Sequence, residues 1–229
     1  MALEGWTGWH GEGKTYNAVT HVLNEWDRHG IPIWSNAQIA GCEIFENWDE
    51  LMQMIELAIE HHLRAQVLID EAGKWLSSRF FTKLDPRVLT VLQERRKVGA
   101  GLDLYWTAPH IDHVDKILRD VTQAVHTCKR FGGTEYSHDG GKPPRAFYVR
   151  TYRPNEVGKA NKKAIARAIV PFTSEVADLY TTGLVNMSKP LGDSIARRPD
   201  VRGPDEGSGA PAPAVELHVA GARKREKQR

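Results

Sequence analysis

The sequence predicts an α/β fold with a mainly parallel central sheet that helices cover on both faces. Short apolar runs typical of buried strands alternate with longer segments whose apolar residues recur at helical spacing. A glycine-rich stretch, Gly8–Thr15, lies between the first such strand and the first such helix. Because parallel strands are joined by crossover helices, this alternation predicts a sheet buried between two helical layers.

The first third of the chain contains three predicted strands and two predicted helices. Leu3–Thr7 is a short strand, and Lys14–His29 carries apolar residues on one helical face and ends at a glycine. Ile31–Ser35 is a β-rich run, followed by a predicted helix over Trp48–His62. Gln66–Ile69 has the pattern of a buried strand and leads directly into two acidic residues.

The middle of the chain continues the alternation. Asp85–Lys97 is predicted as a helix because an aspartate cap is followed by proline at the first helical position. Leu102–Trp106 is the next predicted strand and Ile111–Leu118 a short helix. Thr122–Cys128 and Ala146–Tyr152 are two further predicted strands, the second entered through a turn-rich segment.

Length and composition predict one domain and a tail. A chain of 229 residues with 41% hydrophobic residues can build one α/β domain with a full core, which we expect over residues 1–188. Residues 189–229 are rich in Pro, Gly, Asp and Arg, and are expected to form a flexible polar tail with a basic end. That end could contact phosphates or an anionic membrane, although a solvated terminus explains it as well. The net charge of +2 neither requires nor excludes a nucleic-acid partner.

Cysteine usage and hydropathy predict a cytoplasmic protein. Cys42 and Cys128 are the two cysteines and have no ligand or redox spacing, as is usual in a reducing compartment. No apolar run is long enough for a transmembrane helix, and no signal peptide precedes the glycine-rich stretch. These observations leave peripheral attachment at the inner face of the cell membrane open.

The glycine-rich stretch fits the pattern GxxxxGK[ST], which binds nucleotide phosphates. Glycines let backbone N–H groups curl around phosphate oxygens at a helix N-terminus. Lys14 is expected to reach the β- and γ-phosphates of ATP, and the Thr15 hydroxyl to be a ligand of Mg²⁺, which prefers oxygen donors. The candidate nucleotide-binding residues of the motif are Gly8, Trp9, His10, Gly11, Glu12, Gly13, Lys14 and Thr15.

An acidic pair after a buried strand supplies the second half of a nucleotide site. Val67–Ile69 delivers Asp70 to the carboxyl end of the predicted sheet, where α/β folds bind ligands. We expect Asp70 to hold Mg²⁺ and Glu71 to orient or deprotonate the attacking water. The alternative is a solvated acidic pair at a strand end. The phosphate-binding motif upstream favours the catalytic interpretation and predicts a P-loop NTPase.

Two further residues are candidates for the reaction. Thr107 follows the predicted strand Leu102–Trp106 and could sense the γ-phosphate, or could instead cap a turn before Pro109. A ring-forming ATPase needs an arginine that reaches the γ-phosphate of a neighbouring subunit. Arg119 is our candidate among the arginines at 79, 95, 96 and 119, although each is also explained as a surface charge.

Aromatic and thiol groups near the motif have two interpretations each. Trp6 and Trp9 flank the phosphate loop and could stack on adenine or pack the loop against the sheet. His126 and Cys128 share a strand face and could form a thiol–imidazole pair. Strand packing is the preferred interpretation for this pair, because no oxyanion turn is recognisable nearby.

The order of motifs resembles the zonula occludens toxin (Zot) family of phage assembly ATPases, within the FtsK/HerA-like motor ATPases. The resemblance covers about residues 3–185 and rests on Gly11–Tyr16, Ile33–Asn36, Leu68–Ala72, Gln93–Leu104 and Ile111–Arg119. It implies a RecA-like fold, ATP and Mg²⁺ as ligands, and Tyr16 as part of the nucleotide motif. It also implies a homo-oligomeric ring that works on phage DNA, with coat or membrane assembly proteins as further partners. The sequence departs from the family at Thr107, where a glutamine is usual, and in lacking a membrane span after the ATPase domain.

Three functions are compatible with these patterns. The leading hypothesis is an ATP-hydrolysing motor for phage DNA packaging, transfer or virion assembly and extrusion. The second is a nucleotide-gated assembly factor that docks coat or membrane proteins with little motor activity. A small-molecule phosphotransferase comes third, since no acceptor site is recognisable.

Overall fold

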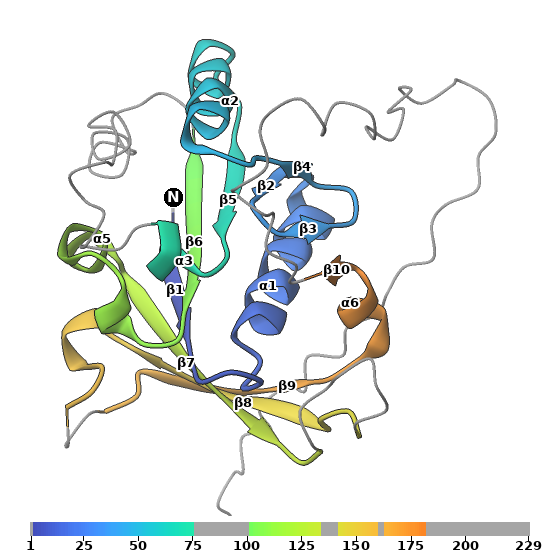
Figure 1. Cartoon of the computed structure of the whole chain (residues 1–229), viewed down its shortest axis with the longest axis vertical. Helices are drawn as coiled ribbons and strands as arrows, with labels where there is room; N and C mark the ends of the chain where they lie inside the picture. Colours follow the sequence, from blue (N-terminus) through green and yellow to red (C-terminus); the bar gives the residue numbers. More distant parts are fainter. Residues whose placement is uncertain (1, 76–100, 134–141, 160–162, 182–229) are drawn as a thin grey trace, which may run out of the picture. The chain divides into compact units, whose positions relative to one another are not determined.

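The computed structural model describes residues 2–75, 101–133, 142–159 and 163–181 (Figure 1). Three expectations lie outside these residues: the helix over Asp85–Lys97, the arginines at 79, 95 and 96, and the domain boundary at 188 with the tail 189–229.

An eight-stranded sheet in the order β4-β2-β5-β6-β1-β7-β8-β9 organises the described residues. All neighbours from β4 to β7 are parallel, whereas β8 and β9 extend the sheet in antiparallel fashion. The strands are β1 Leu3–Thr7, β2 Ile33–Ser35, β4 Glu43–Ile44, β5 Ala65–Ile69, β6 Leu102–Ala108, β7 Ala124–Phe131, β8 Ala146–Tyr152 and β9 Ala166–Pro171. A separate antiparallel pair joins β3, Gln38–Ile39, to β10, Tyr180–Thr181.

Helices pack on both faces of the parallel part of the sheet. Alternate residues of β5 enter different cores, because Leu68 packs with α1 whereas Val67 and Ile69 pack with α2. Strands buried on both faces confirm the predicted mainly parallel sheet between two helical layers. The helices are α1 Lys14–His29, α2 Trp48–Glu60, α3 Ala72–Trp75, α5 Lys116–Val121 and α6 Ser174–Asp178, with 3₁₀ turns η2 Ile111–His113 and η3 Pro154–Glu156.

The predicted first helix has the bounds of α1. Its end is set by Gly30, which adopts a left-handed φ of 65° and donates its N–H to the Trp26 carbonyl at 2.7 Å.

Two predicted elements differ from the structure around β6. The strand continues to Ala108, so Thr107 lies within β6 and not after it. The helix predicted over Ile111–Leu118 is divided into η2 and α5, because the Asp115 side chain accepts a hydrogen bond from the Ile117 N–H at 2.7 Å and starts a new helix.

Strand order brings the two halves of the predicted nucleotide site together. β6 lies between β1 and β5, with Thr7 beside Ala108 and Ile69 beside Trp106 in the register. Since the three strands are parallel, their carboxyl ends meet at one edge of the sheet. The loop after β1, the acidic pair after β5 and the end of β6 are therefore neighbours.

Candidate nucleotide site

The loop between β1 and α1 has a backbone that requires glycine. Gly11 and Gly13 adopt left-handed φ angles of 72° and 82°. A Cβ atom on Gly13 would lie 2.3 Å from the Phe147 ring, which packs against the loop from β8. The loop is also held at its start, where the Gly8 N–H donates to the Pro109 carbonyl at 3.3 Å. These contacts fix the loop in one conformation at the start of α1.

The N-terminus of α1 carries no side-chain cap and no acidic residue in its first turn. The first N–H groups of a helix have no partner within the helix, and the helix dipole adds a partial positive charge there. Half-buried Lys14 is the first residue of the helix and adds a full charge. This end of α1 is thus suited to bind an anion such as a phosphate.

Two residues of this segment, Glu12 and Tyr16, have side chains committed to other contacts, and a third, Trp9, is largely exposed. The Glu12 carboxylate accepts the backbone N–H of Arg130 at 2.7 Å and ties the loop to β7. Tyr16 is buried, with its ring near Phe147, and its hydroxyl donates to the Pro171 carbonyl at 3.1 Å. The side chain of Tyr16 therefore belongs to the core. Trp9 is 77% exposed.

Asp70 is the centre of a hydrogen-bonded cluster at the carboxyl edge of the sheet. The Thr15 hydroxyl donates to Asp70 Oδ1 at 2.8 Å, and the Thr107 hydroxyl donates to the same oxygen at 2.6 Å. Thr107 is fully buried, and Thr15 and Asp70 are nearly so. The structure thus joins the glycine loop to the acidic strand end through one carboxylate oxygen.

The backbone around Asp70 is held by two neighbouring strands. Asn36, just after β2, donates to the Asp70 carbonyl at 2.9 Å and accepts the Asp70 N–H at 2.7 Å. The Thr107 hydroxyl accepts the Glu71 N–H at 2.9 Å. The sequence analysis assigned no role in the site to Asn36. The one feature that could have indicated such a role is that Asn36 is a polar residue directly after a predicted strand.

Glu71 differs sharply from Asp70, although the two are adjacent. Its φ of 51° places a non-glycine residue in the left-handed region, a strained conformation that the surrounding hydrogen bonds maintain. Its carboxylate forms an ion pair with Lys74, three residues later on α3, and 38% of the Glu71 side chain is exposed. Lys74 is a second residue near the site that sequence reasoning missed.

Arg119 is engaged within its own chain. Its Nη1 donates to Asp112 Oδ1 at 2.7 Å, and His110 Nδ1 lies 3.2 Å from the other Asp112 oxygen. The structure places Arg119 on α5, whereas the Asp70 cluster is formed by residues from α1, β6 and the ends of β2 and β5.

Trp6 and the His126–Cys128 pair are structural. Trp6 is 3% exposed, and its ring stacks on that of His126 with centroids 4.6 Å apart. The two ring nitrogens of His126 contact Glu4 at 2.8 Å and Thr151 at 3.0 Å, so the imidazole is not paired with the thiol. Burial raises the pKa of the Cys128 thiol well above its usual range, which keeps it protonated.

The described part of the chain contains neither a membrane-spanning helix nor a cluster of metal ligands. No helix there is sufficiently long and apolar to cross a bilayer. Three or more His, Cys, Asp or Glu residues suited to hold a metal ion do not cluster anywhere in residues 2–75, 101–133, 142–159 and 163–181.

Comparison with protein families identifies the family of the chain, and comparison with solved structures identifies its fold. The family model of zonular occludens toxin (Zot) matches residues 4–137, more than half of the chain. No curated protein sequence matches the chain.

Two solved structures with a similar fold are informative. The N-terminal domain of zonular occludens toxin from Neisseria meningitidis is 18% identical with a TM-score of 0.50, over 79% of this chain and 100% of that one. The genome packaging NTPase B204 from Sulfolobus turreted icosahedral virus 2, in complex with ATP-gammaS, is 12% identical with a TM-score of 0.51, over 75% and 98%. Together with the sheet order, these likenesses establish the α/β P-loop NTPase fold of RecA type that the sequence predicts.

Proposed function

The chain belongs to the zonular occludens toxin family, and we propose that it is a P-loop ATPase. It would bind ATP together with Mg²⁺ at the loop Gly8–Thr15 and hydrolyse the ATP. The observation that carries this proposal is the pair of hydrogen bonds from Thr15 and Thr107 to Asp70 Oδ1. They place a hydroxyl, a carboxylate and an uncapped helix N-terminus at one edge of the sheet.

The residues at this edge fit a magnesium–triphosphate group. Thr15 and Asp70 offer two oxygen donors that already touch each other, which is the ligand type Mg²⁺ prefers. When bound, Mg²⁺ would neutralise charge on the terminal phosphates. Lys14 and the N–H groups of the α1 N-terminus would hold the phosphate oxygens.

Glu71 and Thr107 have complementary proposed roles. The Glu71 carboxylate, partly exposed at the strand end, would accept a proton from the attacking water. Thr107 would act as a positioning residue for both acidic neighbours, because its hydroxyl bonds the Asp70 carboxylate and the Glu71 N–H. This assignment refines the expected role of Thr107 as a sensor of the γ-phosphate.

We further propose that the protein acts as a homo-oligomeric ring on phage DNA, in packaging, transfer or virion assembly and extrusion. The family and the fold shared with a genome packaging NTPase support this role. Arg119 would serve the site of a neighbouring subunit after release from Asp112. Residues 1–188 would form the ATPase domain and 189–229 a flexible polar tail with a basic end, in a cytoplasmic protein that could act at the inner face of the cell membrane.

The test is ATP turnover of the full chain with and without DNA, combined with its oligomeric mass in solution. A motor should form a ring and hydrolyse ATP faster when DNA is present. Turnover that DNA does not change, in a protein that stays monomeric with DNA and ATP present, would rule out the motor.

One observation favours a second function, the nucleotide-gated assembly factor. The ion pair with Lys74 occupies the carboxylate of the proposed base, Glu71, which would keep turnover slow until a partner separates the two side chains. In that case a coat or membrane protein, and not DNA, should change the rate of ATP hydrolysis.

A further inference from the structure

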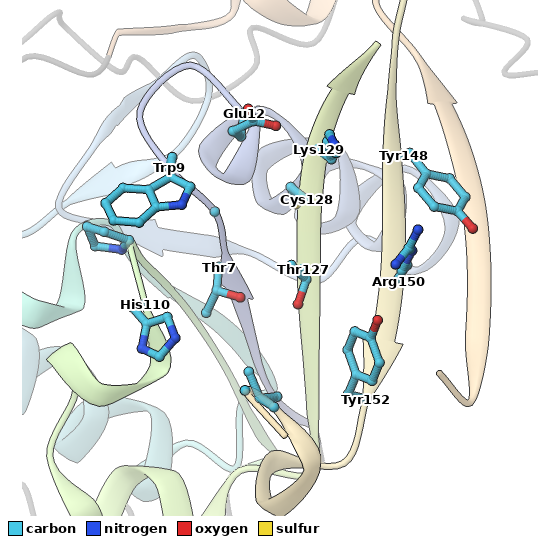
Figure 2. Close-up of a pocket in the computed structure, with 14 residues that line it drawn as sticks. Thr7, Trp9, Glu12, His110, Thr127, Cys128, Lys129, Tyr148, Arg150 and Tyr152 are labelled. Carbon is cyan, nitrogen blue, oxygen red and sulfur yellow. The ribbon is translucent and has the colours of Figure 1, made fainter. Parts of the chain in front are cut away.

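A pocket of about 450 Å³ lies beside the start of the glycine loop. Figure 2 shows Trp9 and His110 on one side of it and Tyr148, Arg150 and Tyr152 on the other. Its volume is within the range of roughly 300–1,000 Å³ of pockets that bind small organic ligands. Aromatic rings on both sides make it suitable for a flat, aromatic group.

The pocket lies on the face of the sheet opposite α1. Phe147 and Val149 of β8 pack in the same core as residues of α1, so the alternate residues Tyr148, Arg150 and Tyr152 point the other way. Lys14 and Thr15 do not line the pocket. Gly8, Trp9 and Glu12 of the phosphate motif do line it, so the pocket adjoins the proposed ATP site and its occupant would lie beside the phosphates that the N-terminus of α1 would hold.

The strands that form this side of the pocket are strongly basic. Over the described residues between 124 and 171, Glu156 is the single acidic residue. The basic residues of the same part are Lys129, Arg130, Lys142, Arg145, Arg150, Arg153, Lys159, Lys163 and Arg167. The full sequence between 124 and 171 has ten basic and three acidic residues, so positive charge is concentrated on β7–β9 and their connections in a chain whose net charge is only +2. A polyanion is the partner that such a concentration attracts.

Cationic and apolar side chains form rows across these strands. Register places Lys129, Tyr148 and Ile169 in one row, and Thr127, Arg150 and Arg167 in the next. Lys129, Arg150 and Arg167 are exposed, and Ile169 is 73% exposed. The Arg150 guanidinium lies over the Tyr148 ring, 4.9 Å from its centroid. We call these two rows the open face.

We propose that the open face and the adjoining pocket bind single-stranded nucleic acid. Bases would stack on Trp9 and on the Arg150–Tyr148 pair, and phosphates would contact Lys129 and Arg167. A single strand fits better than a duplex, because only unpaired bases can leave the stack and enter a pocket lined by rings. This proposal assigns a binding site for the DNA on which the protein is proposed to act. It rests on that proposed function for the identity of the polymer.

Fluorescence anisotropy of a labelled oligothymidine strand tests this site in the full chain without added nucleotide. Tyr148→Ala should weaken binding by roughly 5- to 100-fold, because one base–aromatic stack is lost, whereas Tyr148→Phe should retain most of the affinity. Replacing Lys129, Arg150 and Arg167 together by alanine should flatten the slope of log affinity against log salt by about 1.4, the amount expected for the two phosphate contacts of Lys129 and Arg167.

Matched controls separate this site from general charge effects. Arg28→Ala removes an exposed cation from the last turn of α1 and should leave affinity and salt slope unchanged. Alanine at Arg223, Lys224 and Arg225 removes the same number of charges from the basic end of the chain. Loss of binding in this variant alone would overturn the proposal.

Other outcomes would assign the pocket to another ligand. Displacement of the strand by equimolar duplex, by ATP or by vesicles of anionic lipid would each contradict a single-strand site. A parent protein that hydrolyses ATP but does not bind the strand refutes this inference alone. A protein that binds the strand but shows no ATP turnover refutes the proposed ATPase alone.

Discussion

Polar side chains are buried in one region of the sheet and exposed in another. The first region is the edge where β1, β5 and β6 end, and the second is the open face of β7–β9. At the edge, Thr15, Asp70 and Thr107 are almost completely buried and bond one another. On the open face, Lys129, Arg150 and Arg167 are exposed to solvent. Buried polar groups require a fixed geometry, whereas exposed cations require only a sheet surface. Substitutions at the edge should therefore affect both stability and catalysis, and those on the open face mainly affinity.

The largest effect is expected from Asp70→Asn, which keeps the shape of the side chain but removes its charge. We predict a fall in the rate of ATP hydrolysis of about 100-fold or more, since the proposed metal ligand is weakened. Steady-state phosphate release would measure it. Arg150→Ala is the control from the open face and should hydrolyse ATP at the parent rate without DNA. Equal rates for the parent and Asp70→Asn would remove Asp70 from the mechanism.

Gly13→Ala should destabilise the fold by about 1–3 kcal/mol, because the new methyl group would meet the Phe147 ring in a strained backbone. Urea unfolding followed by circular dichroism gives the free energy. Gly30→Ala is a matched control, since Gly30 is also left-handed but has open space around its Cβ position. An equal decrease in the free energy of unfolding for the two variants would show that the contact with Phe147 does not determine the need for glycine at position 13.

Thr107→Val removes the hydroxyl that joins Asp70 and Glu71. An unsatisfied buried N–H and a lost hydrogen bond to a carboxylate should cost about 1–3 kcal/mol of stability. ATP turnover should fall with it, measured alongside urea unfolding, and Thr107→Ser should restore both. Rescue of stability without rescue of turnover would show that the hydroxyl acts in the fold only.

The smallest expected effect is a pH dependence of the free energy of unfolding, which arises from residues where β1, α1 and β7 meet. Burial lowers the pKa of His21 below its ordinary value of 6.5. The unfolded chain therefore binds a proton at His21 more readily than the folded chain does. The free energy of unfolding should consequently decrease as pH falls below about 6.5. Glu4 adds a second loss at lower pH, because its hydrogen bond to His126 lowers the pKa of its carboxyl.

Thermal or urea unfolding between neutral and mildly acidic pH measures the effect of His21. His21→Phe keeps an aromatic ring beside Trp6 and Tyr105 and should flatten the pH dependence near 6.5. An unchanged pH profile in this variant would assign the dependence to other groups.

Sequence patterns predicted the parallel strands β1, β2, β5, β6 and β7, because their signals are local, but not the two-residue parallel strand β4. A glycine loop between a strand and a helix, and an acidic pair after an apolar strand, specify both their geometry and their place at the sheet edge. The sequence also predicted that the glycine loop and Asp70 form one site, and the structure places Thr15 and Asp70 in hydrogen-bond contact.

The remaining features depend on tertiary contacts that leave little local signal. β9 is mostly exposed on both faces and has no apolar alternation, so it was not predicted as a strand. The break between η2 and α5 depends on whether Asp115 caps a helix or lies within one. Asn36 and Lys74 belong to the site through their partners, Asp70 and Glu71, and not through a motif of their own.

Calorimetric titration of the Glu71→Gln protein with ATP, with and without Mg²⁺, examines whether the glycine loop and Asp70 together hold a metal-bound triphosphate. We expect saturable binding to one site per chain, weakened when Mg²⁺ is omitted and abolished by adding Lys14→Ala. Binding that is indifferent to both Mg²⁺ and Lys14, or no uptake of ATP at all, would show that this edge of the sheet is not a nucleotide site.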